Sequence, residues 1–383
     1  MTRILHVIRS CDPASGGPIE GIRQRAKALQ EMGHEVEVVS LDEADPIRDP
    51  DLIVHALGPG KGSYGYSRRL VPWLLEKGAS YDFVIANGIW QYTSFATRKA
   101  MQKLNKPYFV FTHGMLDPWF KTAYPLKHLK KAIYWPWGEY RVLRDAAAVL
   151  FTCEEERVLA RKSFKLYRSN ERVVSYGTSG PVGDPGSQVE AFLERHSELK
   201  GKRIILFLSR IHPKKGCDNL LEAFALVCSS EPSLHLVIAG PDQLGLRSEL
   251  EGLADTLGIK NRITWTGMLS GDMKWGAYHA SECFILPSHQ ENFGIVVAEA
   301  LACGKPVLVS NKVNIWREIE SDISGLVAED TKDATADMLT KWNELSVAEK
   351  GKMAKSARSC FENRFEIAAS AQSLLQVLGE VGQ

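Results

Sequence analysis

Two glutamates frame the stretch from Pro287 to Pro306, in which a predicted loop leads into a predicted helix over about 293–303. Glu291 and Glu299 stand eight positions apart, with Gly294 between them. A helix N-terminus attracts phosphate, because its N–H groups lack partners and its dipole is positive there. At about 1.5 Å per helical residue, the two carboxylates are predicted to lie roughly 12 Å apart. This spacing suits a nucleotide diphospho-sugar, with sugar hydroxyls at Glu291 and ribose hydroxyls at Glu299; the alternative is a surface helix that carries two glutamates by chance.

A second candidate for phosphate binding follows the predicted strand at 203–208. Arg210 and Lys215 stand five positions apart, in the turn between this strand and a predicted helix that ends near Cys228. Two cations in such a turn can bind one diphosphate from both sides and neutralise the charge that grows when its bond to a sugar breaks. The alternative is a pair of surface cations without a ligand.

The first half of the chain alternates short apolar runs with helical stretches. Gly16 and Gly17 follow the first run and would let the backbone approach a phosphate, although such a pair is more often an ordinary loop. In open α/β sheets, ligands gather at the carboxyl ends of the strands. The predicted strands cover 4–8, 34–41, 51–57, 81–86 and 106–111. The candidate residues that follow the last two of these strands are Asn87, Trp90, His113, Asp117 and Trp119.

The composition is that of a soluble globular protein. The 383 residues, 44% of them apolar, suffice for two domains that each have their own core. A formal net charge of +1 gives no indication of a nucleic-acid partner. Seven cysteines without a C-x-x-C pair argue against a disulfide framework and against a structural zinc site. No apolar run approaches the about 18 residues of a membrane span, so we expect a cytoplasmic protein.

The stretch from Lys121 to Arg144 combines basic and aromatic side chains, and Pro136 is predicted to divide it into two helices. One interpretation is a solvated basic face over an aromatic core. The other is an interfacial patch that contacts anionic lipid at the inner face of the plasma membrane. Further along the chain, four glycines and two prolines within 177–186 predict a linker between domains.

The motifs of the second half resemble those of the retaining glycosyltransferases of family four, which use nucleotide sugars. The resemblance rests on Glu291-Asn292-Phe293-Gly294, on the six residues from Glu299 to Gly304, and on Pro306-Val307. Asn292 departs from the pattern, because members often have glycine there. Arg210 and Lys215 match the diphosphate-binding turn of the family. The segment 112–119 resembles a branch that builds bacterial exopolysaccharides.

The resemblance implies an α/β protein of the GT-B fold, with two Rossmann-like domains facing each other across a deep cleft. We expect an acceptor-binding domain over 1–180, a nucleotide-sugar-binding domain over 187–360, and a C-terminal helix over 361–383 that packs back on the first domain. The residues expected to be catalytic are His113, Glu291, Arg210 and Lys215. Those expected to bind the donor are Gly16, Gly17, Arg210, Lys215, Met268, Glu291, Asn292, Phe293, Gly294, Ile295 and Glu299. Those expected on the acceptor side are Asn87, Trp90, Asp117 and Trp119.

The implied activity is transfer of a hexose, with retention of the anomeric configuration, to a hydroxyl of a polyprenyl-linked or saccharide acceptor. UDP-glucose is the expected donor and GDP-mannose the next candidate. No metal or other cofactor is expected, because Arg210 and Lys215 supply the positive charge. His113 is expected to assist the transition state by hydrogen bonding and not as an obligatory base.

Three other classes of protein compete with this interpretation. A nucleotide-sugar epimerase of the same fold would convert its substrate without releasing free UDP at each turnover. A nicotinamide dehydrogenase needs a G-x-G-x-x-G fingerprint after the first strand, which Gly16-Gly17-Pro18 does not supply. A non-catalytic sensor of sugar nucleotides would have little use for two cations and two glutamates.

Overall fold

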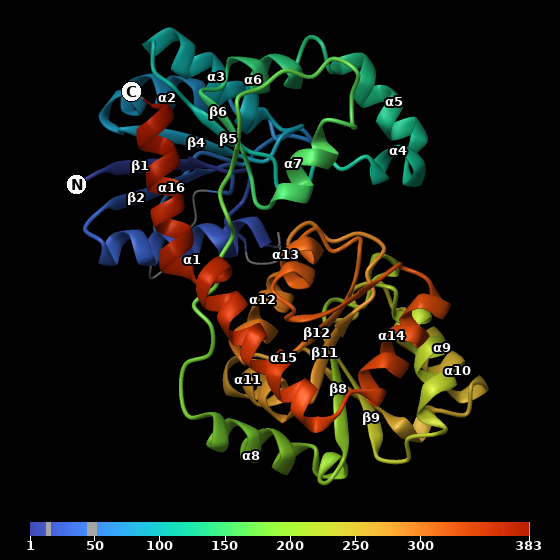
Figure 1. Ribbon diagram of the computed structural model, residues 1–383. Helices are drawn as coiled ribbons and strands as arrows, with labels where there is room; N and C mark the ends of the chain where they lie inside the picture. The colour runs from blue at the N-terminus through green and yellow to red at the C-terminus, as the bar shows by residue number, and fades with distance from the viewer. Residues whose placement is uncertain (13–16, 44–51, 383) are drawn as a thin grey trace. The chain divides into compact units, whose positions relative to one another are not determined.

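A computed structural model of the chain describes residues 1–12, 17–43 and 52–382. Its contacts divide the chain into two compact units, Met1–Ser179 together with Glu366–Gln383, and Gly180–Phe365. Each unit is built around one parallel sheet with helices on its faces, as Figure 1 shows. Two Rossmann-like sheets were expected, and both are present.

The sheet of the first unit has seven strands in the order β3-β2-β1-β4-β5-β6-β7, and all its neighbours are parallel. Consecutive parallel strands need a crossover connection, which explains the alternation of apolar runs and helical stretches in the sequence. The strands are β1 (Arg3–Val7), β2 (Glu35–Ser40), β3 (Ile53–Ala56), β4 (Phe83–Asn87), β5 (Phe109–Phe111), β6 (Ala148–Phe151) and β7 (Glu171–Val173).

Helices cover both faces of this sheet. The core on one face includes residues of α2, α3 and α6, and the core on the other face includes residues of α1 and α16. The helices of the first unit are α1 (Gly17–Glu31), α2 (Leu70–Lys77), α3 (Tyr92–Leu104), α4 (Trp119–Ala123), α5 (Pro125–Tyr134), α6 (Glu139–Asp145), α7 (Glu154–Ala160) and α16 (Ile367–Val381).

The C-terminal helix α16 belongs to the first unit, as expected, and packs against α1 (Figure 1). It begins later than the predicted Phe361, because residues 361–365 form a π-helical turn of the second unit. The Glu366 carboxylate then accepts hydrogen bonds from the N–H groups of Ala368 and Ala369, at 2.9 and 3.1 Å. These bonds cap two unpaired donors of the first turn and thereby fix the start of the helix.

The sheet of the second unit has six parallel strands in the order β10-β9-β8-β11-β12-β13. Its strands are β8 (Arg203–Leu208), β9 (Leu234–Ala239), β10 (Ile263–Gly267), β11 (Cys283–Leu286), β12 (Val307–Ser310) and β13 (Gly325–Ala328). Its α-helices are α8 (Pro185–Arg195), α9 (Cys217–Cys228), α10 (Arg247–Thr256), α11 (Gly271–Ala280), α12 (Ile295–Ala302), α13 (Trp316–Ser321), α14 (Lys332–Glu344) and α15 (Val347–Cys360).

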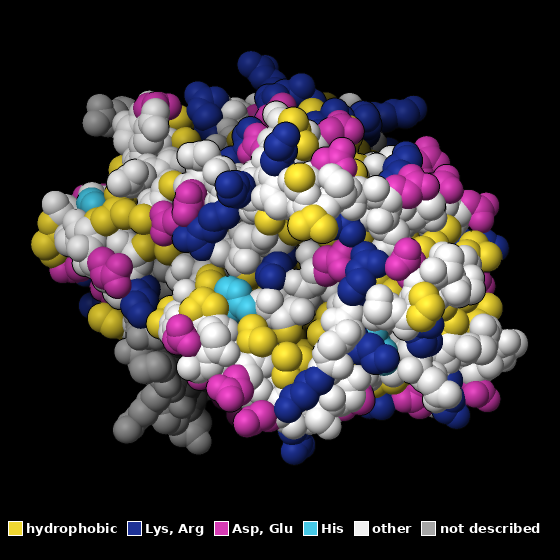
Figure 2. All heavy atoms as spheres, turned by 60° about the horizontal axis from the view of Figure 1, so that its bottom comes forward, with side chains coloured by type: hydrophobic (Ala, Val, Ile, Leu, Met, Phe, Trp, Pro, Cys, Tyr) yellow, Lys and Arg dark blue, Asp and Glu magenta, His cyan; other side chains and the backbone are white. Residues whose placement is uncertain are grey.

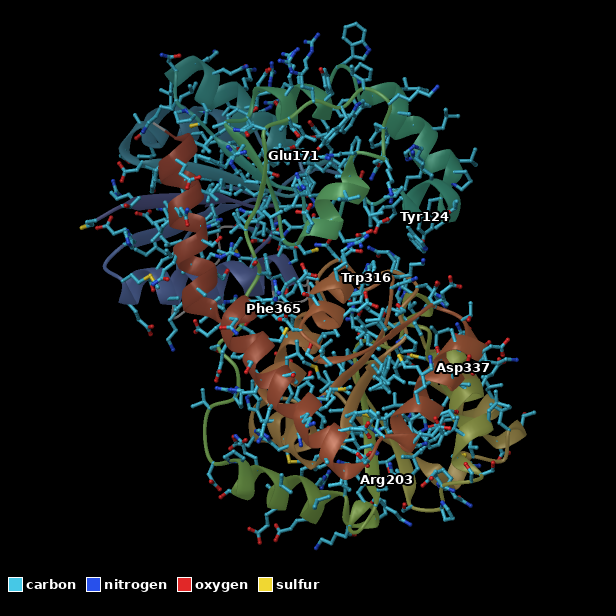
Figure 3. All side chains as sticks on the ribbon, in the orientation of Figure 1. Tyr124, Glu171, Arg203, Trp316, Asp337 and Phe365 are labelled. Carbon is cyan, nitrogen blue, oxygen red and sulfur yellow. The ribbon has the colours of Figure 1, made fainter. Side chains whose placement is uncertain are left out.

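A group of ion pairs holds the amino-terminal edge of this second sheet. Arg203, labelled in Figure 3, begins β8 and donates to the carboxylate of Glu282 just before β11, at 2.8 and 2.9 Å, and to that of Glu231, at 2.8 Å. These ion pairs tie β8 to the chain before β9 and before β11 at the amino ends of the strands. Figure 2 shows acidic and basic side chains interspersed over the face in view.

Helix α8 was not predicted from the sequence. The Asp184 carboxylate accepts a hydrogen bond from Ser187 N at 2.7 Å, and Pro185 is the first helical residue. An aspartate at the N-cap followed by proline is a helix-start signal, so this element could have been predicted. The glycines and prolines at 177–186 favoured a linker prediction there instead.

Within the described ranges, no helix has both the length and the apolar character that crossing a bilayer requires.

Gly21 of α1 offers a test of the packing in the first unit. A Cβ atom at Gly21 would lie 2.0 Å from the buried ring of Tyr176, whereas one at Gly379 of α16 would meet no atom within 4 Å. Gly21→Ala is therefore expected to destabilise the protein by about 1–3 kcal/mol through overpacking. Gly379→Ala should instead stabilise it by up to about 1 kcal/mol, because alanine favours a helix. Urea unfolding measures both changes, and equal stabilisation by the two variants would contradict this packing.

Candidate functional site

The loops that carry the predicted phosphate-binding residues meet at the centre of the second sheet. Strands β8 and β11 are neighbours, but the chain continues from β8 to β9 on one side and from β11 to β12 on the other. At such a topological switch point the two connections diverge, and they leave a crevice at the carboxyl ends of the strands. Lys215 comes from the connection after β8 and Glu291 from the connection after β11.

The structure brings Lys215 and Glu291 into an ion pair between Nζ and Oε2. Lys215 is only 7% exposed, so Glu291 replaces much of the water around its ammonium group. The backbone holds the two loops together, because His289 N donates to Lys214 O at 2.7 Å. Gly216 closes the turn with φ of 64°, and a Cβ atom there would lie 2.3 Å from the carbonyl oxygen of Pro287. Only glycine allows this approach.

Glu299 lies in a separate polar contact on α12. Its carboxylate accepts hydrogen bonds from Lys274 Nζ at 2.8 Å and from the Tyr278 hydroxyl at 3.2 Å, and the residue is 6% exposed. Both donors belong to α11 and lie four residues apart on the same face, so both reach the one carboxylate. Neither was singled out in the sequence, although their spacing of four in a predicted helix was visible.

The start of α12 corrects one prediction. The helix begins at Ile295 and not near residue 293, because Gly294 has φ of 75° and ψ of 67° and serves as the N-cap. Glu299 is therefore the fifth helical residue, just over one turn into the helix. Glu291 lies outside it, with its N–H donating to Lys312 O at 2.9 Å. The estimate of roughly 12 Å for the carboxylate separation assumed a continuous helix, so it does not carry over.

The remaining predicted residues of this unit differ in their surroundings. Arg210 is exposed, and its charge helps to lower the pKa of His212, after burial and ahead of Lys214 and Lys215. Met268 is 75% exposed beyond the end of β10. Phe293 is buried and packs edge-on against Phe365, labelled in Figure 3, with ring centroids 5.5 Å apart.

Asn292 and Ile295 are the last two residues predicted to bind the donor. Asn292 accepts a long contact of 3.5 Å from Asn314, and Ile295 opens the helix.

A cavity of about 140 Å³ lies at the corresponding switch point of the first sheet, between β1 and β4. Its walls come from the residues that follow β1, β4 and β5 and from the start of α1. They are Ile8, Arg9, Ser10, Pro18, Ile19, Asn87, Gly88, Gln91, His113 and Met115. Gly17 is the first residue of α1 beside this wall, and Gly16 lies outside the described residues.

Asn87 joins two histidines at this cavity. Its Oδ1 lies 3.2 Å from Nε2 of His113, and its Nδ2 lies 3.1 Å from Nδ1 of His6. With the amide in this orientation, Nε2 of His113 donates and its Nδ1 carries no proton. The Glu156 carboxylate fixes the loop, because it accepts from Gly114 N at 2.6 Å and from Thr112 Oγ1 at 2.7 Å. His113 itself has φ of 49°, a left-handed conformation that this support maintains.

A buried guanidinium keeps both imidazoles neutral. Arg25 is 2% exposed, lies between the rings of Phe111 and Tyr176 at 5.2 and 5.1 Å, and donates to Ser370 Oγ on α16. Burial and the charge of Arg25 lower the pKa of His113 to about 3, and they lower that of His6 to about 3 as well. His113 therefore acts at neutral pH as an uncharged hydrogen-bonding group. No sequence motif pointed to Arg25, since it reads as one more basic residue of a surface helix.

The other acceptor-side candidates do not line this cavity. Trp90 packs against Trp135 and Phe164, with ring centroids 5.6 and 5.4 Å away. The Asp117 carboxylate accepts from Trp119 N at 2.8 Å, and the Trp119 indole contacts Tyr124. In the described part of the chain, no group of three or more His, Cys, Asp or Glu side chains is placed to hold a metal ion.

Comparison with solved structures defines the fold class. The chain is similar to a sucrose-phosphate synthase from Thermosynechococcus elongatus, with 21% identity, a TM-score of 0.77 and 99% of each chain covered. It is also similar to Anabaena HepE in complex with UDP-glucose, with 18% identity, a TM-score of 0.78, and 99% of this chain and 100% of that chain covered. The fold is thus the arrangement of two Rossmann-like domains known as GT-B.

Comparison with protein families identifies the chain more closely. The family described as "Glycosyl transferases group 1" matches residues 188–359, and a "Glycosyl transferase 4-like domain" matches residues 16–177. The chain belongs to the group 1 glycosyltransferases.

Among curated relatives, a D-inositol 3-phosphate glycosyltransferase of Mycolicibacterium gilvum is 33% identical over 53% of this chain and 46% of its own length. An alpha-D-kanosaminyltransferase of Streptomyces kanamyceticus is 26% identical over 64% of each. The chain spans about half the length of most of the curated relatives that it matches.

The ion pair between Lys215 and Glu291 predicts strong energetic coupling. Removing one partner leaves the other charge largely buried and unpaired, whereas removing both does not. A double-mutant cycle of Lys215→Met and Glu291→Gln should therefore give a coupling free energy of about 1–3 kcal/mol. The exposed pair Arg247 and Glu251 is the control, with about 0.5 kcal/mol or less expected. Additive effects at Lys215 and Glu291 in urea unfolding would show that the pair does not form.

The neutral histidines predict a loss of stability in acid. His6 has a pKa of about 3 in the folded chain, against an ordinary value near 6.5, so the unfolded state binds the extra proton as the pH falls. Stability is therefore lost between about pH 6.5 and pH 3. From pH 7 to pH 5, His6→Gln should lose about 2 kcal/mol less than the wild type. Parallel pH profiles of the free energy of unfolding would contradict the buried, neutral state of His6.

Proposed function

We propose that the chain is a retaining hexosyltransferase that binds a nucleotide sugar at the switch point of its second sheet. The observation that carries this proposal is the position of the Lys215–Glu291 ion pair directly before the glycine-capped N-terminus of α12. A cation and a helix N-terminus favour a diphosphate, and an adjacent carboxylate accepts hydrogen bonds from sugar hydroxyls. Membership of the group 1 glycosyltransferases supports the same conclusion.

Donor binding would exchange the existing contacts for contacts to the ligand. In this proposal Lys215 and the exposed Arg210 bind the diphosphate, while Glu291 turns to the hexose hydroxyls. Glu299, held by Lys274 and Tyr278, accepts the ribose hydroxyls. UDP-glucose is the proposed donor, since the similar structure of HepE contains it, and GDP-mannose is the next candidate.

The proposed transfer needs little acid–base chemistry from the protein. The acceptor oxygen forms its bond to the anomeric carbon on the face from which the diphosphate departs, so the configuration is retained. The acceptor proton passes to the leaving phosphate oxygen. Arg210, Lys215 and the N-terminus of α12 stabilise the negative charge that develops there. These cations are proposed to make a metal ion unnecessary.

His113 is assigned a hydrogen-bonding part in the first unit. Its neutral imidazole donates its Nε2–H to Asn87 and keeps an unprotonated Nδ1, which suits accepting a hydrogen bond from a sugar or acceptor hydroxyl better than acting as a base. Asn87 orients the ring, and the small cavity at the switch point provides the acceptor side.

The acceptor is proposed to be a lipid-linked or oligosaccharide intermediate of exopolysaccharide synthesis. The sequence of residues 112–119 supports this choice, because it resembles the branch that builds bacterial exopolysaccharides. The names of the two curated relatives point to different substrates and do not decide the acceptor. The proposed location is the cytoplasm, with peripheral contact at the inner face of the plasma membrane through 121–144.

Release of nucleoside diphosphate tests the proposal directly. Wild-type protein is incubated with UDP-, GDP- and ADP-sugars in the presence of a metal chelator, and slow release from one donor is expected. Lys215→Met should reduce this release by about 100-fold or more, and Glu291→Ala should abolish it. Glu344→Gln, at the exposed end of α14, is the control and should leave the rate unchanged.

Two results would contradict the assignment. Conversion of the sugar without release of nucleotide would identify an epimerase. Release that vanishes with the chelator, and returns with Mg²⁺, would contradict the part given to Arg210 and Lys215.

A further inference from the structure

The first unit has a second, larger pocket, which shares no lining residue with the small cavity. It has a volume of about 570 Å³ and is lined by six aromatic side chains and three lysines. The lining residues are Tyr64, Tyr66, Trp90, Tyr92, Phe95, Lys127, Lys130, Lys131 and Tyr134. We propose that this aromatic pocket binds a phosphate-bearing lipid of an anionic membrane, with its chain against the aromatic rings and its phosphate at the lysines.

The aromatic walls are held in place by contacts among themselves. Tyr92 contacts Tyr66 and Tyr64, with ring centroids 4.8 and 6.0 Å away, and the hydroxyls of Tyr64 and Tyr134 lie 3.2 Å apart. These contacts join the loop before α2 to the start of α3 and the end of α5. The rings therefore form a preorganised apolar surface, which suits a hydrocarbon chain.

The polar groups of the pocket are suited to an anion. The side chains that line it offer ammonium and hydroxyl donors, and no carboxylate or amide is among them. Lysines supply no acceptors, so the tyrosine hydroxyls alone could accept hydrogen bonds from a neutral sugar. A phosphate uses the donors of several lysines at once.

The three lysines of the pocket form no ion pair with any residue that the structure describes. In the described part of the chain, Lys127, Lys130 and Lys131 have no carboxylate within ion-pair distance. The ammonium of Lys131 instead lies 4.5 Å from the centroid of the Trp90 ring. Burial and the charge of Lys127 lower the pKa of Lys131 to about 8, so an arriving phosphate would relieve an existing electrostatic cost.

The carboxylate of Glu139 offsets these charges only in part. Glu139 is fully buried behind the pocket, and its carboxylate accepts a hydrogen bond from Ser94 Oγ at 3.2 Å. Burial raises its pKa to about 7, so about half of it is uncharged at neutral pH. The pocket thus keeps a positive character that an anionic headgroup complements.

Helix α5 extends the pocket to a surface suited to a membrane. Leu126, Leu129, Ile133 and Trp137 follow one another at helical spacing and are 77%, 58%, 69% and 71% exposed. The helix buries no residue completely, although it is ten residues long. Tyr124, labelled in Figure 3, marks its start, and α5 lies at the edge of the first unit in Figure 1.

On the helical wheel, Lys130, Lys127 and Lys131 lie between this apolar stripe and the packed side of α5. An interfacial helix has this arrangement, with apolar side chains in the acyl boundary and lysines at the level of the phosphates. A lipid beside the stripe would have its headgroup at the three lysines and the mouth of the aromatic pocket.

The inference deepens the proposed function, on which it rests for any role of the lipid as acceptor. The test measures binding in the absence of a nucleotide sugar, so its failure is distinguishable from failure of the transferase assay. The probe is dihexanoylphosphatidic acid below its critical micelle concentration, followed by titration calorimetry. Dihexanoylphosphatidylcholine and inorganic phosphate are the comparison ligands.

The wild type should bind the monomeric anionic lipid more tightly than either comparison ligand. Lys130→Gln and Lys131→Gln should each weaken binding about fivefold, because one lysine near a phosphate contributes about 1 kcal/mol. Lys103→Gln, an exposed lysine of α3, should have no effect. Equal binding of the neutral lipid, or equal effects of the three substitutions, would overturn the proposal.

Vesicle flotation separates the pocket from the apolar stripe. Vesicles contain phosphatidylcholine alone or equal parts of phosphatidylcholine and phosphatidylglycerol, and only the second kind should retain the wild type. Leu129→Gln with Ile133→Gln should abolish retention but leave binding of the monomeric lipid unchanged. Retention on anionic vesicles without any binding of the monomeric lipid would show surface attraction only and would overturn the pocket as a site.

Discussion

The ion pair between Lys215 and Glu291 depends on the order of strands in the second sheet. The two residues are far apart in the sequence, yet they follow neighbouring strands whose connections leave in opposite directions. Divergence of the two loops creates the crevice, and glycines at 216 and 294 let the backbones approach it closely. The side chains of Lys215 and Glu291 then lie in this crevice. Without this strand order, Lys215 and Glu291 would not meet.

The first sheet uses the same topological position in a different way. Its cavity is lined by polar and apolar side chains around a neutral histidine, whose pKa is lowered by burial and, after burial, by the charge of the buried Arg25. Ser370 of the C-terminal helix accepts hydrogen bonds from that guanidinium, so the end of the chain helps to set the properties of His113. The second unit thus places an ion pair at its switch point, while the first places a neutral imidazole there.

Much of the fold could be predicted from the sequence, because strands buried on both faces are continuous apolar runs. The runs before Asn87 and before Pro287 both became strands at the expected places. The start of α12 was misplaced, since good helix formers precede Gly294 but the left-handed conformation of this glycine ends any helix there. The partners of the candidate residues were harder to foresee. Lys274, Arg25 and Glu156 act through tertiary contacts that no local pattern encodes.

The basic and aromatic stretch shows the same limit. Its composition allowed both a packed face and an exposed apolar face, and the structure contains both. Trp135 is buried in the core, whereas Leu126 and Trp137 are exposed. Which apolar side chains face outward depends on the orientation of α5 against the loop before α2, and that packing is a tertiary property.

A nucleotide sugar is proposed to bind at the switch point between β8 and β11 of the second sheet. Hydrogen exchange of the backbone amides, measured by mass spectrometry with and without UDP-glucose, tests it most directly. The account predicts slower exchange in the peptides that cover 209–217 and 289–299, where the backbone of both loops meets the ligand. Protection confined to other segments, such as 121–144 or the carboxyl ends of the first sheet, would contradict it.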